Sequence, residues 1–219
     1  MNFAVILAAG VGKRFGSEKQ FVKIKNLPVI YYSIKAFNQS PVIDKIIIVT
    51  KKERIGYLRQ LVKKYNFSKV ENIVEGGLRR QDSMRNALKI LPDKGNIAIH
   101  DSARPLLNQS IITQGFRLVK KYKAVIPVLS VTDTIKQVKN DFVIKTIDRT
   151  DLSYVQTPQF FELGLVKKAY LKAEHTNYYA TDDANLIEHL WKKVYVISGL
   201  KQNIKITDLD DLALVKKLL

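Results

Sequence analysis

Residues 3–20 read FAVILAAGVGKRFGSEKQ. The first seven of these residues are continuously apolar, which is typical of a strand buried in a parallel sheet. Glycines follow at positions 10 and 12, and the cations Lys13, Arg14 and Lys19 lie within ten residues of the run. A buried strand that opens into a glycine-rich, cationic loop lets the backbone approach a polyphosphate and neutralise it. The stretch therefore predicts a nucleotide-binding α/β enzyme.

This loop matches neither of two common phosphate-binding patterns. Walker A requires Ser or Thr directly after its lysine, whereas Gln20 follows Lys19. The dinucleotide fingerprint G-x-G-x-x-G requires glycine where this chain has Phe15. Two cations on one loop, Arg14 and Lys19, suit a phosphate chain that reacts at its inner phosphorus. For the loop taken alone, a plain glycine turn with solvated lysines stays open as an alternative.

The net charge of the chain bears on its possible binding partners. The 219 residues include 37 Lys and Arg against 20 Asp and Glu, a formal net charge of +17, so nucleic acid and anionic membranes must be considered as partners. The lysines, however, come in scattered pairs at the ends and polar faces of predicted helices, where they complement the helix dipole. We therefore expect no nucleic acid and no membrane partner, although the positive field still attracts a nucleoside triphosphate.

Cysteine and histidine content narrows the class further. The chain has no cysteine, which excludes disulfides, thiolate catalysis and cysteine-ligated metals. His100, His175 and His189 lack metal-ligand spacing, so we expect all three to be structural or on the surface. No apolar run approaches the ~20 residues of a membrane-spanning helix. We expect a protein of the cytoplasm.

Apolar runs alternate with helical segments along the whole chain, as in α/β folds. We therefore expect one domain over residues 1–219 with a mostly parallel central sheet. The expected strands are residues 3–9, 45–50, 70–74, 96–100, 124–129 and 194–197. The expected helices are residues 29–38, 53–65, 82–91, 109–122, 162–173, 182–191 and 208–218.

One segment departs from this alternation. Two β-rich runs, residues 131–139 and 142–148, are joined around Asn140-Asp141 and predict a hairpin inside an arm at about residues 131–154. A two-stranded arm is marginally stable alone in water, so we expect a second copy of the protein to support it in a homodimer. An arm folded back on its own domain stays open as the alternative.

Polar segments follow the predicted strands. In open α/β sheets, ligands bind beyond the carboxyl ends of the strands, so these segments are expected to converge. They are the glycine loop, residues 75–83, residues 101–105, the arm with Thr134 and Arg149, and residues 157–159, 181–183 and 203–207. In the last of them Lys205 alternates with apolar neighbours, which predicts a short strand with the lysine on the opposite face. Taken singly, each segment has a structural explanation, such as a local ion pair between Asp101 and Arg104.

The same segments carry a family resemblance. They read LAAGVGKRFGSEKQ (7–20), EGGLRRQDS (75–83), HDSARP (100–105), VTDTIK (131–136), IDR (147–149), QTPQFF (156–161), TDDA (181–184) and NIKIT (203–207). In this order, and over nearly the whole chain, they resemble the 2-C-methyl-D-erythritol 4-phosphate cytidylyltransferase family.

The resemblance implies a Rossmann-like α/β domain with a protruding dimerisation arm, and a role in the non-mevalonate route to isoprenoid precursors. It also implies transfer of CMP from CTP to 2-C-methyl-D-erythritol 4-phosphate with Mg²⁺ as cofactor. The implied catalytic residues are Arg14, Lys19, Arg149 and Lys205. The implied nucleotide-binding residues are Ala8, Ala9, Gly10, Gly12, Lys13, Gly76, Gly77, Ser83 and Asp101. The implied acceptor-binding residues are Asp101, Arg104, Thr134, Arg149, Thr157 and Lys205, with Thr134 and Arg149 coming from the arm of the other protomer.

The chain departs from the family pattern at two places. The stretch between Arg14 and Lys19 is shorter than usual, and Glu18 stands where a proline is common. Leu78 follows the glycine pair where an acid is frequent, which leaves contact with the base to the main chain there.

Two other functions stay open at this stage. A ribitol-5-phosphate cytidylyltransferase has the same glycine loop and arm, but its members tend to read L-A-G-G where this chain has Leu7-Ala8-Ala9-Gly10. A basic nucleic-acid-binding module needs cations clustered along one face with aromatic platforms. Tyr31-Tyr32 and Tyr178-Tyr179 are not set among such clusters.

Overall fold

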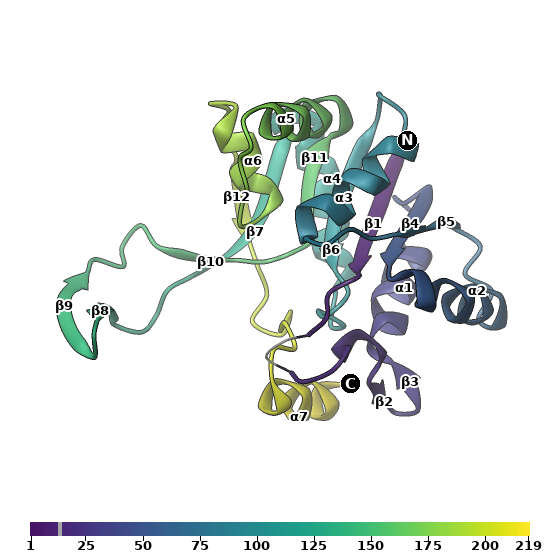
Figure 1. Ribbon diagram of the computed structural model, residues 1–219, viewed down its shortest axis with the longest axis horizontal. Helices are drawn as coiled ribbons and strands as arrows, with labels where there is room; N and C mark the ends of the chain where they lie inside the picture. The colour runs from purple at the N-terminus through teal and green to yellow at the C-terminus, as the bar shows by residue number, and fades with distance from the viewer. Residues whose placement is uncertain (13–14) are drawn as a thin grey trace.

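One large sheet organises the protein, whose computed structural model describes residues 1–12 and 15–219 (Figure 1). Its strands are β1 Asn2–Ala8, β4 Lys45–Thr50, β5 Val70–Glu75, β6 Asn96–Asp101, β7 Ala124–Ser130, β10 Ser153–Val155, β11 Gln159–Glu162 and β12 Tyr195–Ser198. Within the described chain these eight strands follow the order β10-β7-β11-β6-β1-β4-β5, with β12 paired to β7.

The sheet is mostly parallel, as the sequence predicts. β1 runs parallel to β4 and β6, β4 to β5, and β7 to β12. β11 is antiparallel to β6 and β7, and β10 is antiparallel to β7. β10 and β11 are not predicted from the sequence, because runs of three and four residues are too short for a periodic signal.

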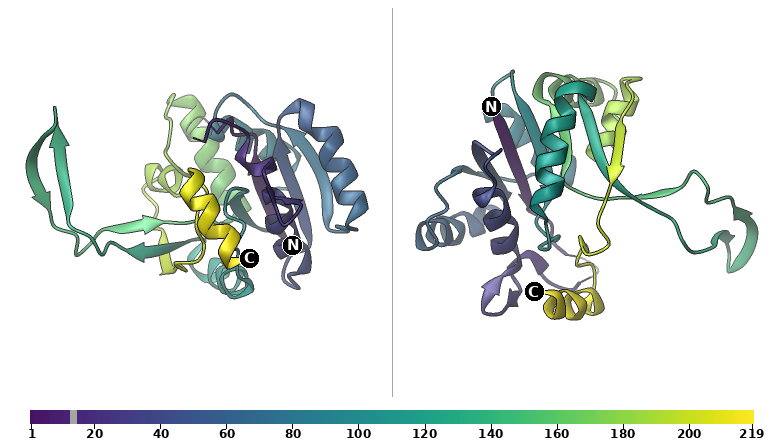
Figure 2. Two further views of the ribbon diagram at one scale, coloured as in Figure 1. Left: turned by 90° about the horizontal axis from the view of Figure 1, so that it is seen from below. Right: turned by 180° about the vertical axis from the view of Figure 1, so that it is seen from behind.

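Helices cover both faces of the sheet. One face carries α3 (Arg80–Ile90), α5 (Leu163–His175) and α6 (Asp183–His189). The other carries α1 (Val29–Gln39), α2 (Ile55–Lys64) and α4 (Gln109–Tyr122), and the right-hand view of Figure 2 shows α4 in front of the sheet. A short 3-10 turn, η2 (Lys52–Arg54), precedes α2 where the sequence predicts the helix to begin. No helix in the described part of the chain combines the length and hydropathy needed to cross a membrane.

A small third core closes the lower end of the molecule in Figure 1. It joins α7 (Leu209–Leu218) to the short hairpin of β2 (Lys23–Ile24) and β3 (Leu27–Pro28). Ile24, Ile206 and Leu212 are buried together there. Ile206 N also donates to Ala103 O at 2.9 Å. This contact holds the segment before α7 against the residues that follow β6.

The predicted arm projects away from the body in all views (Figures 1 and 2). β8 (Ile135–Lys139) and β9 (Phe142–Ile147) pair antiparallel in a sheet of their own. Asn140 and Asp141 join them with φ of 49° and 65°, the left-handed conformation that a two-residue hairpin turn favours. Val138, Phe142, Val143 and Ile144 are each more than half exposed. The hairpin therefore does not fold back onto its own domain in this structure.

Packing between α4 and β11 leaves no room for a side chain at Gly115. A Cβ there would lie 2.3 Å from ring atoms of Phe160. We predict that Gly115→Ala lowers the free energy of unfolding by about 2 kcal/mol, because overpacking outweighs the gain in helix propensity. The matched control is Gly56→Ala in α2, where nothing lies within 4 Å. There, helix propensity alone predicts a gain of about 0.5–1 kcal/mol. Urea denaturation measures both changes, and a Gly115→Ala protein as stable as the wild type would contradict this packing.

Candidate active site

The glycine loop is tied to the end of β1 by a side chain that the sequence analysis left without a role. Gln20 is 3% exposed, and its Nε2 donates to Ala8 O at 2.9 Å and to Gly10 O at 2.8 Å. Gly12 has φ +65°, and a Cβ there would lie 1.9 Å from Ser17 O, so only glycine fits. The K-Q pair at the end of the first motif was the available signal for Gln20.

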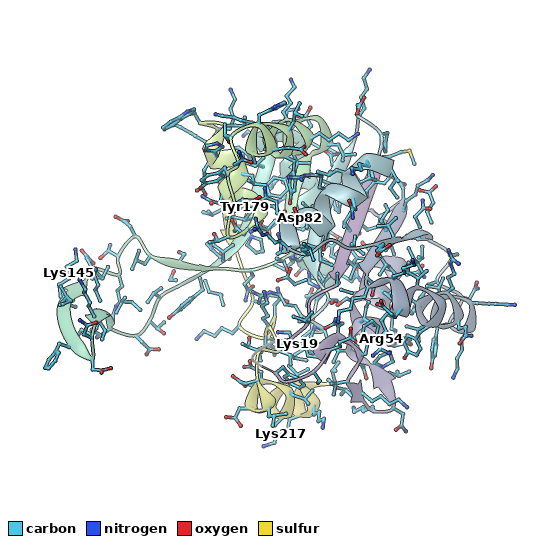
Figure 3. The ribbon with its side chains drawn as sticks, viewed as in Figure 1. Lys19, Arg54, Asp82, Lys145, Tyr179 and Lys217 are labelled. Atoms are coloured by element: carbon cyan, nitrogen blue, oxygen red, sulfur yellow. The ribbon has the colours of Figure 1, made fainter. Side chains whose placement is uncertain are left out.

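Of the three cations predicted on this loop, the described residues include Lys19. It begins the 3-10 turn η1 (Lys19–Phe21), directly beyond the loop, and is labelled in Figure 3. Lys13 and Arg14 lie outside the described residues, so their roles stay predictions.

A second glycine loop follows β5 and touches the first. A Cβ at Gly76 would lie 2.4 Å from Ala9 Cβ and 2.9 Å from Ser83 Oγ, so only glycine allows this approach. Gly76 N donates to Thr50 O at 2.7 Å, and Gly77 N donates to Ser83 Oγ at 3.1 Å. The structure thus brings the predicted base-binding residues beside the end of β1.

Asp101, at the end of β6, is the centre of a cluster of cations. Its Oδ2 accepts from Lys205 Nζ at 2.6 Å, and its Oδ1 accepts from Arg80 Nε at 3.2 Å. Its main-chain N donates to Thr157 Oγ1 at 3.1 Å. Because Asp101 is paired in register with Leu7 of β1, this Asp101 cluster lies next to the glycine loop.

Arg104 is positioned by main-chain carbonyl groups. Its NH1 donates to Asn203 O at 2.7 Å, and its NH2 donates to Val155 O at 3.4 Å. The local ion pair between the side chains of Asp101 and Arg104, which the sequence left open, is not formed among the described residues, although Arg104 N donates to Asp101 O at 3.0 Å. Instead, Asp101 pairs with Lys205, a residue 104 positions away.

The short strand predicted around Lys205 is wrong, since residues 203–207 form no strand among those described. Side-chain amides hold this segment in place of a ladder. Asn203 Nδ2 donates to Thr157 O at 2.8 Å, and Gln156 Nε2 donates to Leu200 O at 2.9 Å. Alternation of one lysine between two isoleucines was too short a pattern to distinguish a strand from an extended, side-chain-bonded segment.

The charges in the cluster stabilise one another. Burial by itself would raise the pKa of Asp101, but Arg80 and Lys205 outweigh burial and hold this pKa well below its usual range. Burial would lower the pKa of Arg80, yet Asp183 and Asp101 hold it well above its ordinary value. Arg80 NH2 lies 2.7 Å from Asp183 Oδ2, and the Tyr170 hydroxyl donates to Asp183 Oδ1 at 2.5 Å. At neutral pH the Asp101 carboxylate and the Arg80 guanidinium are therefore both ionised.

Arg80 and Asp183 were missed as site residues by the sequence analysis. Both lie in motifs quoted for the family, residues 75–83 and 181–184, but neither motif shows that the two side chains meet. Asp183 is fully buried near the start of α6, and a buried carboxylate requires a partner. The position of Asp183 on the apolar face of a predicted helix was the one local signal that its carboxylate is buried and paired.

Thr134 and Arg149 lie on the arm segment and are exposed. Neither forms a hydrogen bond or ion pair with Asp101, Arg104 or Lys205 in the part of the chain that the structure describes. A single chain thus brings together the predicted acceptor residues of the body and leaves out the two on the arm.

Comparison with known proteins shows which family has this sequence and fold. The family model for IspD, 2-C-methyl-D-erythritol 4-phosphate cytidylyltransferase, matches residues 2–219. The protein of that name from Clostridium acetobutylicum is 42% identical over 223 residues, which cover 100% of this chain and 97% of the relative.

Solved structures agree with the sequence match. The 4-diphosphocytidyl-2C-methyl-D-erythritol synthase of Anaerococcus prevotii has a TM-score of 0.87 at 28% identity, covering 100% of this chain and 97% of that one. The 2-C-methyl-D-erythritol 4-phosphate cytidylyltransferase of Francisella tularensis has a TM-score of 0.84 at 29% identity, covering 100% and 99%.

The fold and the residues at its carboxyl edge define an enzyme of the nucleotidyltransferase class. These matches extend over the arm as well as the body, since they cover almost every residue. The chain belongs to the 2-C-methyl-D-erythritol 4-phosphate cytidylyltransferase family. The comparisons do not favour the ribitol-5-phosphate enzyme or the nucleic-acid-binding module that the sequence left open.

His100 directly precedes Asp101 in β6 and is fully buried. Its Nε2 donates to Arg104 O at 3.1 Å, and its Nδ1 accepts from Thr157 Oγ1 at 3.2 Å, which is the hydrogen bonding of a neutral ring. Burial lowers the pKa of His100 to about 4. The ring is therefore neutral in the folded protein at neutral pH and holds the Thr157 hydroxyl through this hydrogen bond.

This buried ring makes stability depend on pH. We predict that, because of His100, the free energy of unfolding is about 2 kcal/mol lower at about pH 5 than at about pH 7.5. The reason is that the unfolded chain takes up a proton near pH 6.5, whereas the folded chain resists it down to about pH 4. Urea titrations across this range measure the slope. His100→Gln should lose it and His175→Gln, at an exposed ring, should keep it. Equal slopes in the wild type and His100→Gln would contradict the assignment.

Proposed function

We propose that the chain transfers the cytidylyl group of CTP to 2-C-methyl-D-erythritol 4-phosphate, giving 4-CDP-2-C-methyl-D-erythritol and pyrophosphate. Membership of the family supports this reaction. The observation that carries it to this chain's own residues is the Asp101 cluster, where Lys205, Arg80 and Arg104 concentrate positive charge next to the glycine loop. A site of this kind suits two anionic substrates that must approach each other.

The proposed reaction is an in-line displacement at the α-phosphorus of CTP. A phosphate oxygen of the acceptor forms a new P–O bond while the bond from the α-phosphorus to the bridging oxygen breaks. Pyrophosphate leaves with that electron pair. Because a phosphate monoester is already an anion near neutral pH, no general base is required. The protein contributes positioning and electrostatic stabilisation.

The glycine loop is assigned to the nucleotide. Lys19 and Arg14 stabilise charge at the α-phosphate, and main-chain groups of the loop bind the nucleotide. The loop residues in this role are Ala8, Ala9, Gly10, Gly12 and Lys13. The second loop is assigned to cytosine through Gly76, Gly77 and Ser83. Leu78 is fully exposed and offers no polar side chain there, so the main chain of this loop reads the base.

The Asp101 cluster is assigned to the ribose and the acceptor. Lys205 keeps 40% of its side chain exposed while paired with Asp101, so its ammonium is accessible to an incoming phosphate. Arg104, held by Asn203 O and Val155 O, adds positive charge, and the buried Thr157 fixes the main chain of Asp101. Asp101 stays ionised and accepts hydrogen bonds from hydroxyl groups.

Mg²⁺ is proposed to enter as a complex of CTP. The described residues hold no group of three or more His, Asp or Glu side chains placed for a metal ion. Both carboxylate oxygens of Asp101 already accept hydrogen bonds, one from Arg80 and one from Lys205. Triphosphate oxygens are the hard ligands that Mg²⁺ prefers, and a bound Mg²⁺ would supply charge neutralisation to the triphosphate. A cytoplasmic location is part of the same proposal, because the reaction consumes intracellular CTP.

We predict that Lys19→Ala lowers kcat by about 100-fold or more, because it removes a preorganised charge from the transition state. Pyrophosphate release from CTP, with 2-C-methyl-D-erythritol 4-phosphate as acceptor, measures the loss. Lys63→Ala, at an exposed position near the end of α2, is the matched control and should behave as wild type. Ribitol 5-phosphate tested in parallel identifies the acceptor. A near-normal kcat in Lys19→Ala would remove this lysine from the mechanism.

The arm is proposed to complete the site of a second copy in a homodimer. Its exposed apolar side chains, Val138, Phe142, Val143 and Ile144, suit burial against another protomer. Thr134 and Arg149 are then available to the neighbouring acceptor site, where Arg149 adds a second cation for the acceptor phosphate.

Subunit mixing tests this exchange. Lys19→Ala and Arg149→Ala should each be inactive alone. In a mixed dimer, one site carries both substitutions and the other carries neither, because the body and the arm of a site come from different chains. Random mixing should therefore restore about a quarter of wild-type turnover. No recovery above the separate variants would show that each arm serves its own chain.

A further inference from the structure

Two cations from the segment after β4 hold Glu18. Lys51 Nζ lies 2.9 Å from Glu18 Oε1, and Arg54 Nε donates to Oε2 at 2.7 Å, with a further short contact from Arg54 NH2. The Glu18 side chain is 18% exposed. Burial would raise the pKa of Glu18, but Lys51 and Arg54 lower it overall and keep the carboxylate ionised. We call these three residues the Glu18 clamp.

The Arg54 guanidinium also contacts the far end of η1. Its Cζ lies 4.7 Å from the centroid of the Phe21 ring, which is an attractive cation-π distance. Tyr57 packs edge-on against the same ring with centroids 5.8 Å apart. Between Glu18 and Phe21, Gln20 is buried and bonded to the end of β1. The residues on both sides of Lys19 are therefore anchored.

Lys19 lies between these anchors on a bonded main chain. Its N donates to Ser17 O at 2.9 Å, and its O accepts from Val22 N at 3.2 Å. Figure 3 labels Lys19 and also Arg54, whose guanidinium bonds to the preceding residue, Glu18. The backbone at Lys19 cannot shift without breaking contacts at Glu18 or Gln20, so the root of its side chain is set by the Glu18 clamp and by β1 together.

We propose that the Glu18 clamp positions Lys19 for the transfer step. Lys51 and Arg54 hold the Glu18 carboxylate so that the ammonium of the next residue meets the α-phosphate of CTP. This inference rests on the proposed function, in which Lys19 stabilises the transferring phosphorus. Glu18, Lys51 and Arg54 are positioning residues and do not touch the substrate themselves.

Exposure separates this role from a contribution to folding. Lys51 is 34% and Arg54 is 41% exposed, and ion pairs this accessible to water contribute little to folding stability. A catalytic group displaced by about 1 Å, by contrast, can lose about 100-fold in rate. Breaking the clamp is therefore expected to change turnover rather than the melting temperature.

Two variants break the clamp, and two neighbours serve as matched controls. Glu18→Gln and Arg54→Gln remove one charge each, and we expect each to lower kcat about tenfold or more with the acceptor KM and the melting temperature unchanged. Glu53→Gln and Arg59→Gln make the same charge changes at exposed positions of η2 and α2, and both should behave as wild type.

A double substitution decides whether the effect runs through Lys19. Because the clamp acts by placing that ammonium, Glu18→Gln added to Lys19→Ala should turn over as slowly as Lys19→Ala alone. A general structural defect would instead lower the rate of Lys19→Ala by the same factor that it lowers the wild-type rate.

Failure of the proposed function and failure of the positioning role of the Glu18 clamp give different results. A wild-type protein that does not release pyrophosphate from CTP with the acceptor contradicts the proposed function. If the wild type is active, normal kcat in both clamp variants overturns the positioning role alone. So does a multiplicative loss in the double variant, or an equal loss in the two controls.

Discussion

A single carboxylate at the end of β6 organises the site. Asp101 accepts from Lys205 and Arg80 and is fixed through its main chain by Thr157. A buried carboxylate is costly unless cations and donors surround it. Asp183 meets the same requirement for Arg80 on the other side. The result is a row of alternating charges that crosses from the segment before α7 to α6 and shapes the part of the site that we propose for the acceptor.

The part of the site that we propose for the nucleotide is built on a different constraint, close contact between main chains. Gly76 touches Ala9 at a distance that admits no side chain, and Gln20 ties the glycine loop to the strand that precedes it. Backbone amides in such loops bind phosphate at little cost in reorganisation because they are already fixed. The two halves of the site meet where β1 and β6 lie side by side in the sheet.

Regular elements were predictable from sequence, whereas contacts between distant segments were not. The parallel strands and all seven expected helices occur in the described chain within a few residues of their predicted ends. The errors are β2, β3, β10 and β11, which are too short to show a period, and a predicted strand around Lys205, a segment that is held by side-chain amides instead. Glu18 stood out as a departure from the family pattern, but its partners Lys51 and Arg54 are not evident in the printed letters.

Apolar spacing along residues 3–9 and the later runs was enough to establish an α/β chain with a glycine loop after its first strand, because burial of one or two faces repeats with the period of the element. Pairing of Asp101 with Lys205, 104 residues away, and of Arg104 with Asn203, 99 residues away, came from the packing of the sheet and the third core. Such pairs leave no periodic trace, since each depends on where the whole chain places two side chains. The choice of Arg80 and Asp183 as the supports of the site belongs to the folded molecule for the same reason.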